Sequence, residues 1–206
     1  MAERSREPVA VLGAGGHAKV VIVTLRSAGV PVTAVLDDDP ATWGCEVLGV
    51  PVRGAMAEVA IHAKCAIIAV GSNAARARLA AALPGVEWAT AVHASAVVAE
   101  GVRLGAGTVV FAGAVIQPDA ELGAHVIVNT GASIDHDCVI GECVHLAPGV
   151  RLAGDVTIER GAFLGIGSIV IPGRRVGAGA VVGAGAVVVS DVPAGAIVVG
   201  VPARSR

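Results

Sequence analysis

Aromatic side chains are almost missing from this chain of 206 residues, which contains two Phe, two Trp and no Tyr. Apolar residues nevertheless make up 54% of the chain, so its core must consist mainly of Val, Ile, Leu and Ala. β-Branched side chains pack well on the pleated surface of a sheet. The composition therefore favours stacked β layers over an ordinary globular interior.

A strong charge imbalance and a long apolar run are missing as well. The net charge is −2 and the Lys and Arg residues are scattered, which argues against nucleic acid as a partner. The longest uncharged segment near the C-terminus, 176–190, has fifteen residues and four glycines, and is too short to span a membrane. The N-terminus lacks the apolar run of a signal peptide, and the four cysteines form no CxxC pair. We expect a cytoplasmic protein with reduced thiols and no membrane partner.

Residues 1–88 alternate between segments typical of strands and segments typical of helices. The pattern predicts strands over 9–12, 32–36, 47–52 and 66–70, and helices over 17–28, 55–62 and 73–83. This order indicates a parallel sheet with crossover helices. We therefore predict a small Rossmann-like α/β domain over residues 1–88.

A glycine-rich segment, from Gly13 to Ala18, follows the first predicted strand and begins the first predicted helix. Backbone N–H groups at such a helix start can hold phosphate, and Asp37 ends the second strand where dinucleotide folds place a ribose-binding acid. The pattern indicates a nucleotide, with NAD as the first candidate. However, Ala18 replaces the third glycine of the fingerprint, and about 80 residues hold only half of a dinucleotide fold. These departures disfavour an NAD-dependent oxidoreductase.

From Val92 to Val188, an aliphatic residue recurs every six positions, seventeen times without interruption. The residue two positions earlier is usually small or β-branched, so each hexad directs two side chains inward. Six-residue sides with bends between them close into a triangular coil of eighteen residues, and such coils stack about 4.8 Å apart. We predict a parallel β-helix over residues 89–206, whose hand the repeat does not fix.

The position directly after the aliphatic residue is often glycine, as at Gly105, Gly123 and Gly141, and is Asn129 or Asp135 in two other hexads. These residue types tolerate a left-handed backbone. We therefore expect the left-handed corner of each coil at this position.

Several segments together resemble one family. They are the hexads, GAGGHAKVV near the start, NTGASIDHDCVIGECVHLAPG over 129–149, AFLGIGSIVIPG over 162–173 and GVPAR over 200–204. Over nearly its whole length the chain resembles the bacterial hexapeptide-repeat sugar acyltransferases. These include nucleotide-4-amino-sugar N-acetyltransferases, such as GDP-perosamine N-acetyltransferase, and sialic acid O-acetyltransferases. The resemblance implies a left-handed β-helix, acetyl-CoA as donor, a homotrimer with active sites between subunits, and an N-terminal domain that holds the nucleotide of a nucleotide-linked sugar.

Acetyl transfer to an amine needs a base for the proton that the amine sheds, and histidine suits this role near neutral pH. Among the six histidines, His136 lies two residues after Ile134, at an expected corner, between Asp135 and Asp137. A neighbouring carboxylate can orient an imidazole, although a solvated turn histidine fits the same spacing. The resemblance implies that His136 is the base, that Asp137 raises its basicity, and that the backbone amide of Gly154, eighteen residues later, stabilises the oxyanion.

The resemblance also assigns binding residues in both halves of the chain. Spacing alone leaves structural roles open for His145 and Asp38, and it explains Asn129 either as a corner residue or as a partner near the base. Ala184 lies where some family members have glycine. The implied contacts to acetyl-CoA are His145, Ile166 and Ala184. The implied contacts to the nucleotide sugar are Gly15, Gly16, His17, Asp37, Asp38 and Gly71.

A metal site is the alternative use of histidines on such coils, because zinc-dependent carbonic anhydrases of the gamma class share the hexapeptide architecture. His125, His136 and His145 are separated by 11, 9 and 20 residues, none a multiple of eighteen. No two of them stack on consecutive coils, so we expect no metal.

These features lead to one prediction for the activity. We expect an acetyl-CoA-dependent N-acetyltransferase that acts on the 4-amino group of a nucleotide-linked 4-amino-4,6-dideoxy sugar, with UDP, GDP and dTDP all open as the carrier. The alternatives are an O-acetyltransferase of a sugar or sialic acid, and a non-catalytic scaffold that binds nucleotide sugars.

Overall fold

The computed structural model describes residues 7–206, which divide into two compact units. Among these residues, the first unit extends to Ala94 and the second is Ser95–Arg206. The sequence places the boundary at residues 88 and 89, whereas the contacts within the chain place it at Ala94. Each unit is described by itself below.

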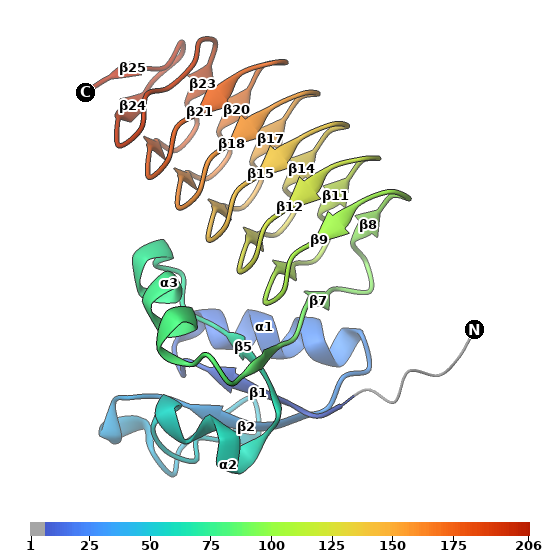
Figure 1. The fold of residues 1–206 in the computed structure, drawn as a ribbon, viewed down its shortest axis with the longest axis vertical. Coiled ribbons are helices and arrows are strands. Elements are labelled where there is room, and N and C mark those ends of the chain that lie inside the picture. Colours follow the sequence, from blue (N-terminus) through green and yellow to red (C-terminus); the bar gives the residue numbers. More distant parts are fainter. Residues whose placement is uncertain (1–6) are drawn as a thin grey trace. The chain divides into compact units, whose positions relative to one another are not determined.

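The first unit contains a parallel four-stranded sheet in the order β2-β1-β5-β6, as the alternating pattern predicts (Figure 1). Because β1 lies between β2 and β5, the loops after these three strands meet at one edge of the sheet. The sheet strands are β1 (Val9–Leu12), β2 (Val32–Leu36), β5 (Cys65–Ile68) and β6 (Glu87–Trp88). The helices are α1 (Gly16–Ser27), α2 (Val59–His62) and α3 (Asn73–Ala82), with 3-10 turns η1 (Pro40–Thr42) and η2 (Met56–Glu58), and β7 (Ala91–Val92) follows.

Two elements of the first unit differ from the sequence prediction. The segment 47–52, predicted as a single strand, is a hairpin of β3 (Glu46–Val47) and β4 (Val50–Pro51). Its two central residues, Leu48 and Gly49, have φ values of 51° and 76°, the left-handed backbone of tight hairpin turns. The helix predicted over 55–62 is the short turn η2 followed by the single turn α2.

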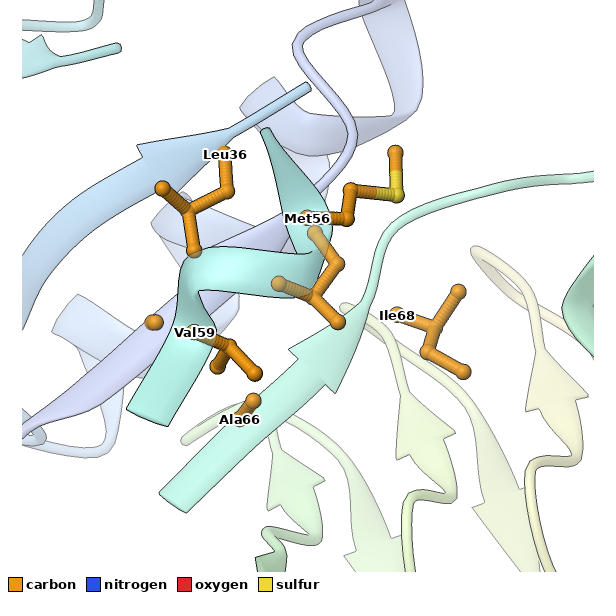
Figure 2. Packing of buried hydrophobic residues seen from close by; sticks show 7 residues of the cluster. Leu36, Met56, Val59, Ala66 and Ile68 are labelled. Atoms are coloured by element: carbon orange, nitrogen blue, oxygen red, sulfur yellow. The ribbon is translucent and has the colours of Figure 1, made fainter. Parts of the chain in front are cut away.

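Aliphatic side chains from the sheet and the η2–α2 segment form a buried cluster in the first unit. Figure 2 shows Leu36 of β2 and Ala66 and Ile68 of β5 facing Met56 and Val59. Met56 is 7% exposed and Val59 is 2% exposed. This packing fixes the loops after β2 and β5, which carry predicted site residues.

The second unit is a left-handed parallel β-helix of hexapeptide repeats with three sheets (Figure 1). Paired strands lie eighteen residues apart, as in Ile127 with His145 and Ser133 with Arg151, so three hexads form one coil as predicted.

The coil has three faces, and we name each face by one of its strands. The β16 face holds β10 (Val109–Val110), β13 (Ile127–Val128), β16 (His145–Leu146), β19 (Phe163–Leu164), β22 (Val181–Val182), β24 (Ile197–Val199) and β25 (Arg204–Ser205). The β14 face holds β8 (Val97–Val98), β11 (Val115–Ile116), β14 (Ser133–Ile134), β17 (Arg151–Leu152), β20 (Ile169–Val170) and β23 (Val187–Val188). The β15 face holds β9 (Arg103–Leu104), β12 (Glu121–Leu122), β15 (Val139–Ile140), β18 (Thr157–Ile158) and β21 (Arg175–Val176).

The predicted inward positions form the core of the coil. From Val110 to Val188, the aliphatic positions are at most 4% exposed, and small residues two positions earlier, such as Ala132 and Ala162, are fully buried. A thin axial layer of Val, Ile, Leu and Ala thus replaces an aromatic core.

The predicted corner position is wrong by two residues. In fifteen of the seventeen hexads the left-handed backbone lies three residues after the aliphatic position, as at Gly131 (φ 65°) and Asp137 (φ 59°). The glycines directly after the aliphatic position instead leave room for the next coil. A Cβ at Gly141, for example, would stand 2.5 Å from the backbone nitrogen of Arg160 in that coil. These glycines allow close stacking and do not supply the turn.

Among the described residues, no helix is both long enough and apolar enough to cross a lipid bilayer.

Candidate active site

The glycine-rich loop connects β1 to α1. Gly13 has a φ of 117°, and a Cβ on it would lie 2.9 Å from the carbonyl oxygen of Ala69, so the loop needs glycine there. Gly15 precedes the first turn of α1, and a Cβ on Gly15 or Gly16 would meet nothing within 4 Å. The two glycines therefore leave open space beside the N-terminus of α1, where backbone N–H groups favour an anion.

Asp37 and Asp38 follow β2, and their carboxylates accept hydrogen bonds from different segments of the chain. One carboxylate oxygen of Asp37 accepts a 2.6 Å hydrogen bond from the Ala14 N–H, and the other accepts from the Asp39 N–H at 2.9 Å. Asp37 therefore fastens the glycine-rich loop to the end of β2. Asp38 accepts from the Met56 N–H at 2.9 Å through one oxygen and lines a cavity.

That cavity lies within the first unit and has a volume of about 390 Å³. It runs from the loop after β2 to α3, and its lining is aliphatic except for one acid and one base. Its lining residues are Asp38, Met56, Val70, Ala75, Arg78, Leu79 and Ala82. A mostly apolar hollow with a few polar groups is a typical small-molecule site.

Sequence reasoning missed Arg76, which is only 1% exposed on α3. Its guanidinium donates to the carbonyl oxygens of Val70 at 3.1 Å and Gly71 at 3.3 Å, and to the Asn73 side chain at 3.0 Å. It thereby fixes the loop that carries Gly71 after β5. The alternation of Ala and Arg in this helix gives no sign of burial, so no sequence signal distinguishes Arg76 from the exposed Arg78.

The first unit thus gathers the residues predicted for the nucleotide at one sheet edge. The glycine-rich loop with Gly15, Gly16 and His17 follows β1, Asp37 and Asp38 follow β2, and Gly71 follows β5. The carboxyl ends of adjacent parallel strands are where ligands bind in open α/β sheets.

In the second unit, His136 projects from the edge between the β14 and β15 faces. Its side chain is 59% exposed, and its Nδ1 lies 2.8 Å from the Asp137 carboxylate. The pKa of His136 is raised, first by this hydrogen bond and then by the charge of Asp135, with smaller contributions from Asp137 and Asp155. Because a carboxylate needs a donor, Nδ1 carries the proton and Nε2 of the neutral ring is free to accept one.

Gly154 lies one coil later at the same edge, directly beside this ring. A Cβ on Gly154 would lie 2.7 Å from Nε2 and 2.6 Å from Cε1 of His136. The coils are joined here by the Asp155 N–H, which donates to the His136 carbonyl at 3.0 Å. The lack of a side chain at Gly154 therefore makes room for the imidazole.

His145 lies elsewhere on the coil, in β16. Its Nε2 is 3.2 Å from the Asn129 side-chain nitrogen, and its ring meets Phe163 edge-on with centroids 5.3 Å apart. Asn129 thus contacts His145 and belongs to the same face. Ile166 and Ala184 are both exposed and sit eighteen residues apart, on the edge between the β16 and β14 faces.

Within residues 7–206, the group with geometry for a metal is Glu7, Cys65 and Glu87, and it includes no histidine. Burial and the adjacent Glu7 carboxylate raise the pKa of the Cys65 thiol to about 11, so the thiol stays protonated and donates to the carboxylates.

The chain resembles known proteins over nearly its whole length. Residues 8–83 match the PglD N-terminal domain family, whereas no curated protein sequence matches. The chain is 44% identical to PerB from Caulobacter crescentus, solved with CoA and GDP-perosamine, over 97% of each chain with a TM-score of 0.91. It is 36% identical to the acetyltransferase domain of PglB from Neisseria gonorrhoeae, solved with acetyl coenzyme A, over 98% and 100% of the chains (TM-score 0.90). It is 30% identical to WeeI from Acinetobacter baumannii, over 96% and 99% (TM-score 0.88).

Two further structures from Caulobacter crescentus are 42% identical to this chain and also contain CoA and GDP-perosamine. One is a perosamine N-acetyltransferase with Asn in place of one histidine, and the other is a GDP-perosamine N-acetyltransferase with Ala in place of one histidine. Identity of 30% or more over nearly the full length of these proteins, together with the α/β domain and the β-helix, establishes the relationship. The chain is an acetyltransferase and belongs to the hexapeptide-repeat sugar N-acetyltransferases.

Proposed function

We propose that this protein transfers the acetyl group of acetyl-CoA to the 4-amino group of a nucleotide-linked 4-amino-4,6-dideoxy sugar. The observation that carries the proposal is the pairing of His136 with Asp137 beside the bare backbone of Gly154. The bound CoA and GDP-perosamine of PerB support the two substrates.

His136 acts as the general base. Its Nδ1–H is held by Asp137, so Nε2 takes the proton that the amine sheds as its nitrogen bonds to the thioester carbon. The C–S bond then breaks, and CoA leaves as the thiol after protonation. Asp137 stabilises the imidazolium that forms, in the manner of a base with its orienting carboxylate.

Gly154 supplies the oxyanion contact in this proposal. A backbone N–H without a side chain beside it can approach an oxygen closely, and positioned donors stabilise developing negative charge strongly. Acetyl-CoA fits the second unit because Ile166 and Ala184 present exposed apolar groups one coil apart, suited to the pantetheine chain. His145 is the proposed polar contact to the same substrate.

The first unit holds the nucleotide. Its phosphates would lie at the N-terminus of α1 beside Gly15, Gly16 and His17, where the open space and the helix dipole favour an anion. Asp38 and the adjoining cavity suit the nucleoside. Gly71, in the loop after β5, is a further proposed contact at the same edge of the sheet. Asp37 supports this site through Ala14.

A homotrimer would complete the site. His136 and Gly154 lie on the edge between the β14 and β15 faces, whereas Ile166 and Ala184 lie on the next edge of the same chain. One copy therefore presents its base and its proposed CoA contacts in different places. On the β16 face Phe163 is partly exposed and Ile197 is 49% exposed, while the β15 face carries the ion pair of Arg103 with Glu121. Apolar faces suit contacts between copies.

A thiol-release assay tests the activity. Purified protein with acetyl-CoA is offered UDP-, GDP- and dTDP-linked 4-amino-4,6-dideoxy sugars, and free sialic acid as the acceptor of an O-acetyltransferase. We expect CoA release with one amino-sugar nucleotide and a loss of about 10²-fold or more in His136→Ala. Light scattering should give three copies for both proteins. Release only with sialic acid would favour the O-acetyltransferase, and nucleotide-sugar binding without release would favour the scaffold.

A further inference from the structure

Asn129 lies beside His145 in the β-helix. It follows β13 at the position directly after the aliphatic residue, where several other hexads have glycine for close stacking. Its backbone N–H donates to the Leu146 carbonyl at 3.0 Å, so its side chain is anchored beside β16 of the next coil. Both Asn129 and His145 are partly buried.

The orientation of the Asn129 amide is set by its neighbour in the chain. The Thr130 N–H donates to the side-chain oxygen of Asn129 at 2.8 Å. Only an oxygen can accept this hydrogen bond, so the other end of the amide is the NH₂ group. That NH₂ group faces Nε2 of His145 at 3.2 Å.

The protonation state of His145 follows from this contact. An amide NH₂ group only donates, so Nε2 must accept and therefore carries no proton. An imidazolium has protons on both nitrogens and could not accept at Nε2. The edge-on contact with Phe163, with an interplanar angle of 86°, adds a second restraint on the ring.

We propose that Asn129 is a positioning residue that holds His145 as the neutral tautomer with its proton on Nδ1. This inference rests on the proposed function for the identity of the substrate that His145 meets. The two histidines then have different tasks: His136 takes a proton at Nε2, while His145 can only donate a hydrogen bond from Nδ1. The carbonyl groups of acetyl-CoA are acceptors of the kind that such a donor recognises.

Nitrogen-15 NMR of the histidine side chains tests the tautomer directly. In the intact protein at pH 7.5, we expect the His145 ring to show a protonated Nδ1 and an unprotonated Nε2. A ring with its proton on Nε2, or an imidazolium, would overturn the proposal. The spectrum requires no substrate, so this result stands or falls independently of the acetyltransferase activity.

Two substitutions separate positioning from a purely structural role. Asn129→Asp replaces the donor with an acceptor and should move the His145 proton to Nε2, whereas Asn129→Gly, the residue that other hexads have here, should remove the tautomer preference. For both we expect kcat/KM for acetyl-CoA to fall at least tenfold, with KM for the nucleotide sugar within twofold of the parent. Asn129→Asp with an unchanged Nδ1–H signal, or with unchanged kcat/KM, would refute the role. Loss of activity with both substrates and a lowered Tm would show that Asn129 is structural.

Discussion

Nε2 of His136 occupies the space that a side chain at Gly154 would fill, since a Cβ there would stand 2.7 Å from that nitrogen. The residue two positions after the aliphatic one is glycine in only one of the seventeen hexads, at Gly154, and is alanine in several, including Ala106, Ala112 and Ala124. The coil itself therefore accepts alanine at this position. Glycine is required here by the imidazole of the preceding coil.

Gly154→Ala should accordingly displace the His136 ring without unfolding the coil. The added methyl would lie below contact distance from Nε2 and Cε1, so the ring must turn away from its position beside Asp137. We expect kcat to fall by roughly 10²-fold, the lower end of what a positioned base contributes. Steady-state CoA release measures the effect, and Ala112→Gly at the same hexad position is the matched control with parental kcat. Parental activity in Gly154→Ala would contradict the proposed base.

The raised pKa of His136 predicts a pH profile for the reaction. A general base works only when unprotonated, so kcat/KM should fall on the acid side with an apparent pKa above the ordinary 6.5 of histidine. In Asp137→Asn the largest cause of the shift is removed, so the acid limb should move to lower pH while the plateau rate decreases.

Asparagine tolerates the left-handed backbone of residue 137, so this substitution leaves the corner intact. Asp119→Asn, at the same corner one coil earlier, should leave the profile unchanged. An acid limb that stays in place in Asp137→Asn would show that the carboxylate does not tune the base.

Periodicity made the second unit predictable, because the 18-residue coil depends on a pattern carried within each hexad. The left-handed positions were misplaced for a physical reason. Gly141 is glycine because the next coil packs on it, whereas the turn lies at the third residue after the aliphatic one and is occupied by Asp137 or Cys143 as well as glycine. A glycine in the sequence does not by itself show whether it is needed for close packing of the next coil or for a left-handed turn.

The candidate site was only partly visible in the sequence. The His136 and Asp137 pair is local and could be predicted from neighbouring residues. The support of the glycine-rich loop by Asp37, and of the loop after β5 by Arg76, depends on which strands lie next to each other. The cavity beside Asp38 likewise depends on the packing of α3, which no local pattern reveals.

The left-handed corners predict opposite effects for two substitutions. A Cβ on Gly131 (φ 65°) would meet nothing within 4 Å, so Gly131→Ala measures backbone strain alone and should lower the free energy of unfolding by about 1–2 kcal/mol. Asp119→Gly removes a smaller strain at φ 62°, because Asp tolerates this backbone better than Ala, and should raise it by up to about 1 kcal/mol. Urea unfolding of both variants measures the difference. The same sign for both would show that side-chain contacts, and not φ, decide stability at these corners.

Replacement of Arg76 should weaken the binding of the nucleotide sugar and leave the binding of acetyl-CoA unchanged. Arg76→Met keeps a long side chain but removes the donors to the Val70 and Gly71 carbonyls, so the loop after β5 loses its support. We expect the free energy of unfolding to fall by roughly 1–3 kcal/mol.

For the same Arg76→Met variant, we also expect KM for the nucleotide sugar to rise about tenfold, equivalent to about 1.4 kcal/mol, while KM for acetyl-CoA is unchanged. Arg76→Lys should recover part of the loss, because its ammonium group can still donate to one of these carbonyls. The exposed Arg78 on the same helix provides the stability control, since Arg78→Met should leave Tm close to that of the parent. Equal increases in both KM values for Arg76→Met, measured well below its Tm, would show that Arg76 supports the fold generally and not the nucleotide edge.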